Sequence, residues 1–231
     1  MRSIRLRSTG HRRIAALTTA AALTLAAAAA ASAKAYAPPP GTPDLARIAL
    51  APSDFAKGHP DSIVGYAFYY PPGIGPGPNS TLAGPGERAA YLREIEAPGT
   101  TGGVKLLVAF SDVALFDTPA DAHAQFEAIR RRYGAADASQ TLLKTMGGSD
   151  TKLKHAETLR SFTAGQEAVL TSLTVRTTPT DTIVSDWVWM RAGGVDASIQ
   201  IESAGPTLAD SAAIALAQTV AAHIKAVIGP K

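Results

Sequence analysis

The feature that most constrains the fold is the alternation of apolar and polar residues between positions 166 and 202. Within this stretch, Gly193-Gly194 is typical of a two-residue hairpin turn, so that Ala192 faces Val195 on the neighbouring strand. Successive side chains of a strand point to opposite faces, and the register therefore decides which residues meet. The alternation predicts antiparallel strands with one face turned toward a core.

A second hairpin extends this sheet if residues 177–180 join two antiparallel strands. Arg176 then faces Asp181, and Val169 faces Val188. This register places one set of apolar residues on a single face, namely positions 169, 173, 175, 184, 188, 190, 195, 197, 199 and 201. A shift by one residue would scatter the set over both faces, so we predict this register. Further strands are expected at 62–70, 88–97 and 104–116, where β-branched and aromatic residues are frequent.

Two amphipathic helices complete the expected fold. Thr118 and Asp121 form a capping pattern around Pro119, and an apolar stripe follows at Ala122, Phe126, Ile129 and Tyr133. Thr207 and Asp210 repeat the capping pattern before a second stripe, which consists of Ile214, Ala217, Val220, Ala221, Ile224 and Ile228. The sequence therefore predicts an α+β two-layer sandwich, with an antiparallel sheet of about five to seven strands and both helices on one face.

The first 33 residues have the pattern of a secretory signal peptide. Five arginines precede an uncharged run, 14–33, that is mostly alanine and ends in Ala31-Ser32-Ala33. A retained membrane anchor is the alternative, but alanine contributes little to membrane insertion, so cleavage is favoured. Cleavage after Ala33 or after Ala35 fits equally well. We expect a Pro-rich linker over 34–43 and one domain over 44–231.

Cleavage reverses the sign of the net charge. The whole chain carries 22 basic and 19 acidic residues, and five of the arginines but none of the acids precede position 34. The mature chain would then have 17 basic and 19 acidic residues, a net charge of −2. This argues against binding to nucleic acid, which needs a clustered basic surface. The chain has no cysteine, which excludes disulfides, thiolate catalysis and a lipid-modified cysteine.

The opposite face of the predicted hairpins is polar except for a pair of aromatic residues. Trp187 and Trp189, the two tryptophans of the chain, are expected side by side, with Trp187 between Leu170 and Gln200. Arg191 lies opposite Asp196 in the same register. A solvated face of this kind does not normally carry two indoles.

Two explanations of the tryptophan pair stay open. The 71–86 loop or the N-terminal segment folds over the pair to make a second small core, which is the commoner arrangement because large exposed apolar patches are rare on monomers. Alternatively, the pair belongs to a contact surface for a ligand or protein, since tryptophan is enriched at binding sites. The second explanation gives the candidate binding residues Trp187, Trp189, Leu170 and Arg191.

No motif for catalysis or for a cofactor is found. The glycines between positions 73 and 77 are separated by a proline that cannot donate a hydrogen bond to a phosphate. The histidines of the mature chain are judged to lack metal-ligand spacing, and His123 and His223 are expected on the solvent sides of their helices. Asp186 falls on the apolar face, and we expect it at a sheet margin that water reaches. No catalytic residue, metal or cofactor is therefore assigned.

The order of these features resembles a known class of domain. Leu50 to Phe55 precede strands, residues 116–122 enter a helix, residues 166–170 begin a strand, and two hairpins lead to a final amphipathic helix. This order is similar to small exported α+β domains of actinobacteria, including the extracellular sensor-like domain of membrane serine/threonine kinases and secreted proteins of PsbP/Mog1-like shape. The resemblance implies a non-enzymatic binding or sensing module, although this chain has neither a kinase nor the disulfide cysteines of the sensors.

The sequence thus favours a secreted, non-enzymatic binding or sensor-like domain in a bacterium. Its partner would be an unknown small ligand or a cell-envelope protein, without nucleic acid and without stable membrane insertion after cleavage. A secreted hydrolase with a site assembled from dispersed residues is the first alternative. An accessory or structural protein of the cell envelope is the second.

Overall fold

The structure is a computed structural model that describes residues 36–55, 62–73, 84–101, 104–134, 152–156, 160–176, 182–205 and 208–229. Backbone contacts divide the chain into residues 1–34 and residues 35–231, and all described residues belong to the second unit. The predicted leader therefore lies outside the described residues.

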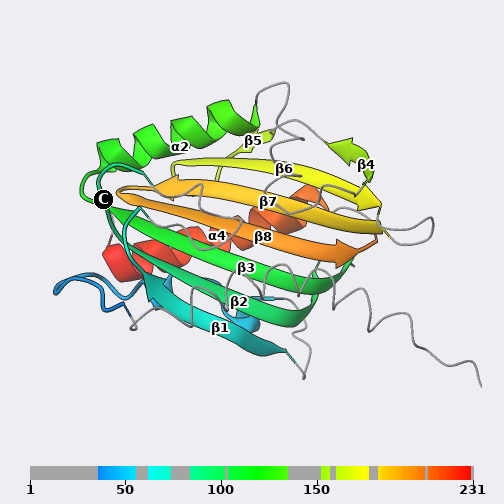
Figure 1. Ribbon diagram of the computed structural model, residues 1–231, viewed down its shortest axis with the longest axis horizontal. Coiled ribbons are helices and arrows are strands. Elements are labelled where there is room, and N and C mark those ends of the chain that lie inside the picture. The colour runs from blue at the N-terminus through cyan, green and yellow to red at the C-terminus, as the bar shows by residue number, and fades with distance from the viewer. Residues whose placement is uncertain are drawn as a thin grey trace, which may run out of the picture. The chain divides into compact units, whose positions relative to one another are not determined.

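The second unit is built on one antiparallel sheet (Figure 1). Its strands follow the order β1-β2-β3-β8-β7-β6-β4, and β5 also pairs with β6. The strands are β1 (Ile63–Tyr70), β2 (Glu87–Thr101), β3 (Val104–Phe116), β4 (Lys152–Ala156), β5 (Arg160–Phe162), β6 (Glu167–Arg176), β7 (Thr182–Ala192) and β8 (Val195–Ala204). The helical elements are the short turns η1 (Leu45–Arg47) and η2 (Pro52–Asp54) and the helices α2 (Pro119–Tyr133) and α4 (Asp210–Ile228). The predicted α+β class with an antiparallel sheet is confirmed.

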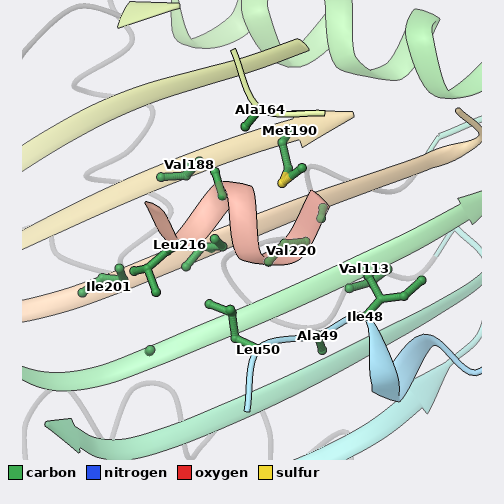
Figure 2. Close-up of a cluster of buried hydrophobic side chains, with 14 of the residues drawn as sticks. Ile48, Ala49, Leu50, Val113, Ala164, Val188, Met190, Ile201, Leu216 and Val220 are labelled. Atoms are coloured by element: carbon green, nitrogen blue, oxygen red, sulfur yellow. The ribbon is translucent and has the colours of Figure 1, made fainter. Parts of the chain in front are cut away.

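One face of the sheet packs against α4 and the segment that contains η1. Figure 2 shows Leu216 and Val220 of α4 among Val188, Met190 and Ile201 of the sheet. Ile48 and Leu50 extend this cluster from the N-terminal segment. Each of these side chains is at most 3% exposed, so this layer is a dry apolar core. By length and composition, α4 is also the one described helix that could cross a membrane.

Helix α2 packs against the other face. Its buried residues form a second cluster with side chains that alternate with those of the first, including Phe110 on β3 and Trp187 and Trp189 on β7. The finer expectation that both helices share one face is therefore wrong. An amphipathic stripe shows that a helix covers a sheet, but it does not specify which face, and here both faces of the central strands carry apolar side chains.

The registers of the two hairpins differ in how well they were predicted. Ala192 pairs with Val195 and Val188 pairs with Ile199, as the glycine turn requires. In the other hairpin Val169 pairs with Trp189, not with Val188, a shift of one residue. Val169 and Leu170 are both apolar, so either register places an apolar residue of this strand on the α4 face. The alternation of apolar residues therefore did not exclude the shifted register.

The two helices also differ at their first turns. The Thr118 hydroxyl accepts a hydrogen bond from the Asp121 amide at 3.1 Å, and the predicted stripe of α2 is buried in full. Helix α4 begins at Asp210 after Ala209, whose side chain makes no cap, and Thr207, where the cap was predicted, lies outside the described residues. Its buried residues are Ala212, Ala213, Leu216, Ala217, Val220 and Ile224, which match the predicted stripe in part.

Candidate functional site

The two tryptophans lie beneath α2. Trp187 and Trp189 are each 1% exposed, and the Trp189 ring stacks on Tyr133 of α2 with 4.5 Å between ring centroids. They face away from α4, as predicted, but a helix covers them, so the expectation of a solvated face is wrong. The pair does form part of a second core. The described N-terminal segment packs on the other face, and residues 74–83 of the 71–86 loop lie outside the described residues.

The structure places the other two candidate residues, Leu170 and Arg191, on opposite faces of the sheet. Leu170 belongs to the α4-side core, because the shift in the β6 register turns it to that face. Arg191 stays on the tryptophan face, where its Nε donates to Glu167 at 2.6 Å and its Nη1 to the Gly193 carbonyl at 3.3 Å. The structure therefore brings Trp187, Trp189 and Arg191 to one face and places Leu170 on the other.

A line of buried polar side chains occupies the same face beside the tryptophans. We call Asp112, Asp196, Ser198 and Gln200 the polar row. Asp112 on β3 pairs directly with Ser198 on β8, which in turn pairs with Trp189. The first three are 0% exposed and Gln200 is 2% exposed.

The polar row is poorly satisfied in hydrogen bonds. Within the part of the chain that the structure describes, both carboxylate oxygens of Asp196 lack a hydrogen-bond partner, as do Asp112 Oδ2, Ser198 Oγ and Gln200 Oε1. Trp189 Nε1 is an unpaired donor beside them. Most buried polar groups in folded proteins have partners, so a concentration of unpaired atoms in one place needs a specific explanation.

Burial raises the pKa of both carboxyl groups in the polar row. Burial raises the pKa of Asp112 to about 8, although the Tyr70 hydroxyl, which donates to its Oδ1 at 2.5 Å, acts in the opposite direction. Burial likewise raises the pKa of Asp196 well above its usual range, against the charge of Arg191. Both groups therefore hold a proton more tightly than an exposed aspartate does.

Further acids extend the polar row along the sheet. Glu202 accepts a hydrogen bond from the Gln200 amide at 3.2 Å, and burial raises its pKa to about 7. Burial also raises the pKa of Glu94 on β2, and the charge of Glu96 adds to this effect. This face is thus rich in hydrogen-bond acceptors and in potential negative charge.

A separate cluster lies at the edge of α2. Donor atoms of His123, Glu127 and Glu167 all lie within 4.8 Å of one another, a spacing that could hold a metal ion. Guanidinium groups already occupy it, because Arg191 pairs with Glu167 at 2.6 Å and Arg130 with Glu127 at 3.0 Å. Burial alone would raise the pKa of Glu167, but hydrogen bonds from Arg191 and His123 lower it overall.

The sequence contained signals for the polar row and for the cluster of His123, Glu127 and Glu167. His123 and Glu127 are one helical turn apart, so the statement that no histidine has metal-ligand spacing to an acid was wrong. Asp112 is the one charged residue of the stretch 108–116, which is apolar apart from it and Ser111, and this marks it as unusual. Asp196, Ser198 and Gln200 were placed on the correct face but were expected in water.

Asp186 is buried at 1% exposure and is not reached by water at a sheet margin. It accepts a hydrogen bond from the Leu208 amide at 2.9 Å, just before α4, and another from the Ser172 hydroxyl. These donors satisfy the buried carboxyl group and assign it a structural role.

The comparison with solved structures finds a distant likeness. No family model matches the chain, and no curated protein is similar to it. Among solved structures, the crystal structure of the extracellular domain of PknH from Mycobacterium tuberculosis is similar at 12% identity and a TM-score of 0.46. The match covers 71% of this chain and 85% of that chain. A likeness this distant assigns neither a ligand nor an activity.

Proposed function

We propose that the protein is an exported, non-enzymatic binding or sensor-like domain whose ligand contacts the polar row under α2. The observation that carries this proposal is the set of unpaired, fully buried oxygens on Asp112, Asp196 and Ser198. Of the predicted binding residues, Trp187, Trp189 and Arg191 lie on this face, and Leu170 does not.

The energetic argument supports a role in binding. A buried polar atom without a partner costs about 1–3 kcal/mol of folding stability, so several such atoms in one place are a considerable cost. An apolar replacement would remove the cost, as the well-packed α4 face of the same sheet illustrates. A ligand that completes the hydrogen bonds of these atoms would offset this cost and explain why the atoms are retained.

A screen of the mature chain, residues 34–231, tests the proposal. Thermal melts and tryptophan fluorescence are recorded with a panel of amines, sugars, carboxylic acids, metal ions and envelope lipids. We expect one class of compound to raise the melting temperature and to change the fluorescence of Trp187 or Trp189, because bound ligand stabilises the native state.

Variants locate the response. Asp196→Asn should abolish it, whereas Asp210→Asn should leave it unchanged, since Asp210 is half exposed at the start of α4 and pairs with Arg160 at 3.0 Å. A response that survives Asp196→Asn, Asp112→Asn and Ser198→Ala alike would place the ligand elsewhere and contradict the proposal.

The hydrolase alternative has one observation in its favour. Asp112 has a pKa of about 8 and a hydrogen bond from Tyr70, which are properties of a general acid. A broad panel of hydrolase substrates distinguishes the two functions. Turnover that is lost in Asp112→Asn would establish the enzyme, whereas binding without turnover supports the binding domain.

Export is tested separately. Mass spectrometry of protein recovered from the culture medium should find an N-terminus at Lys34 or Tyr36. A chain that retains Met1 and stays with the membrane would instead support the retained anchor.

A further inference from the structure

The two edges of the sheet differ in length. Strand β1 forms one edge, and β4 and β5 share the other by pairing with different parts of β6. β1 has eight residues, whereas β4 has five and β5 has three. The outer side of an edge strand carries backbone N–H and C=O groups that can pair with another strand. The β1 edge therefore offers the longer continuous row of these groups.

The two edges also differ in charge. The sequence of β4 contains Lys152 and Lys154, and that of β5 contains Arg160. β1 consists of Ile63–Tyr70 and contains neither a charged residue nor a proline. Charged residues and proline at an edge hinder its pairing with other sheets. β1 lacks this protection, and its β-branched and aromatic residues favour strand pairing.

The residues of β1 are accessible at this edge. In the described part of the chain, the exposed large hydrophobic side chains are Ile63, Val64 and Leu107, at 54%, 45% and 36%. Two of these three lie at the start of β1, and Ala67 in its middle is exposed as well. Among the described strands, β2 alone pairs with β1, so the outer side of β1 is unpaired there. A bulge interrupts the pairing with β2 between Val64 and Ala67, and the pairing is regular from Ala67 to Tyr70.

The side chains of β1 suit a second copy of the same strand. Tyr66 and Phe68 are half-buried on the α2 side of the sheet, with 5.8 Å between ring centroids. Antiparallel pairing about a two-fold axis places like faces side by side, so the aromatic residues of the two copies would adjoin. β1 carries no charge that would repel an identical strand or select a strand of different charge.

An antiparallel arrangement also separates the nearest exposed acid from its counterpart. Glu96 is exposed on β2 and pairs with Ile63 at the start of β1. In antiparallel copies the two Glu96 residues lie near opposite ends of the paired strands, and a strand of this length spans about 27 Å. This distance is several times the Debye length of about 8 Å at physiological salt, so the repulsion between them is screened.

We infer that β1 is a dimerisation edge, where two copies of the chain pair their β1 strands antiparallel about a two-fold axis. The two sheets would then continue into one another, and neither β1 strand would remain an open edge. This inference concerns the outer backbone groups of β1 and involves no ligand, so it is independent of the function proposed for the polar row.

Sedimentation equilibrium of the mature chain, residues 34–231, over a range of concentrations tests the inference. The wild type should reach twice the mass of one chain. Ala67→Lys should weaken dimerisation by at least about tenfold, because antiparallel pairing brings the two residues at this central position close together and like charges then repel. Leu107→Lys is the matched control, since it adds the same charge at an exposed apolar position of β3, which β2 separates from β1. This control should dimerise as the wild type does.

A charge swap makes the test specific for β1. Ala67→Glu should be monomeric by itself and should form a mixed dimer with Ala67→Lys, because opposite charges then meet. Circular dichroism checks the folding of each variant. A wild type that stays monomeric overturns the inference, as does a dimer that resists both substitutions. Equal weakening by Leu107→Lys would show general apolar association, and a mixture of the two Ala67 variants that stays monomeric would show that the β1 strands do not meet; either result overturns the inference.

Discussion

The two faces of the sheet use the same strands in opposite ways. Toward α4, β7 and β8 present Val188, Met190, Ile199 and Ile201, which pack among apolar neighbours. Toward α2, the intervening residues include large indoles and unpaired carboxyl groups, all equally buried. Burial alone therefore does not distinguish a face built for stability from one that holds unsatisfied groups. The state of the hydrogen bonds distinguishes them.

The largest expected effect concerns the α4 face. Ile199→Ala should lower the free energy of unfolding by about 2–5 kcal/mol, because the side chain is fully buried and its removal leaves a cavity. Urea denaturation monitored by circular dichroism measures the change. A loss below about 1 kcal/mol would show that this layer repacks easily and is not the tight core described above.

The pH dependence of stability should come from the α2 face. Asp112 has a pKa of about 8 when folded, above its ordinary value of 3.8, so between these values the folded state holds a proton that the unfolded state has released. Stability should therefore fall as the pH rises, by up to about 1.4 kcal/mol per pH unit, until the pH passes about 8. Burial of Asp196 and Glu202 acts in the same direction.

Urea melts of wild type and Asp112→Asn at several pH values measure this contribution. The variant should show a shallower decrease, because one of the buried groups no longer titrates. Parallel pH profiles for the two proteins would mean that Asp112 is not the group responsible.

A substitution at the residue next to Ile199 should raise the stability of the protein, whereas Ile199→Ala lowers it. Ser198→Ala should raise the free energy of unfolding by about 1 kcal/mol, since it removes a buried hydroxyl that has no partner. Differential scanning calorimetry compares the variant with wild type. If instead Ser198→Ala is destabilising, the hydroxyl is satisfied in solution and the contrast between the two faces is weaker than the structure suggests.

The smallest effect is expected at the edge of α2. His123→Ala should change stability by no more than about 0.5 kcal/mol, because the His123 side chain is half exposed and exposed ion pairs contribute little. Thermal melts at low and high salt measure it. A large loss would indicate that the cluster of His123, Glu127 and Glu167 holds α2 in place over the tryptophans.

The sequence predicted those parts of the fold that local chemistry determines. The Gly193-Gly194 turn fixed the register of β7 and β8 correctly, and the Thr118 cap and the stripe of α2 were also correct. The face that each helix covers is a long-range property, and a stripe carries no information about it. The register of β6 was wrong for a related reason, since adjacent apolar residues at 169 and 170 suit either face.

The candidate site could be predicted only in part. The pairing of Trp187 with Gln200 and of Arg191 with Asp196 followed from the hairpin turn. The contact of Asp112 with this group depends on the pairing of β3 with β8, two strands that are far apart in the sequence. No local pattern specifies such a neighbour, so the acid that completes the polar row was not found from the sequence.

The hydrogen bond from the Leu208 amide to Asp186 has a consequence for how the domain opens. If α4 detached from the sheet by itself, the buried carboxyl group would lose this donor while the Ser172 hydroxyl stayed with the sheet. Partial opening is thereby penalised, and the helix and the central hairpin should come apart together. Amide protons in α4 should accordingly exchange with solvent as slowly as those of β7, even though this helix lies near the end of the chain.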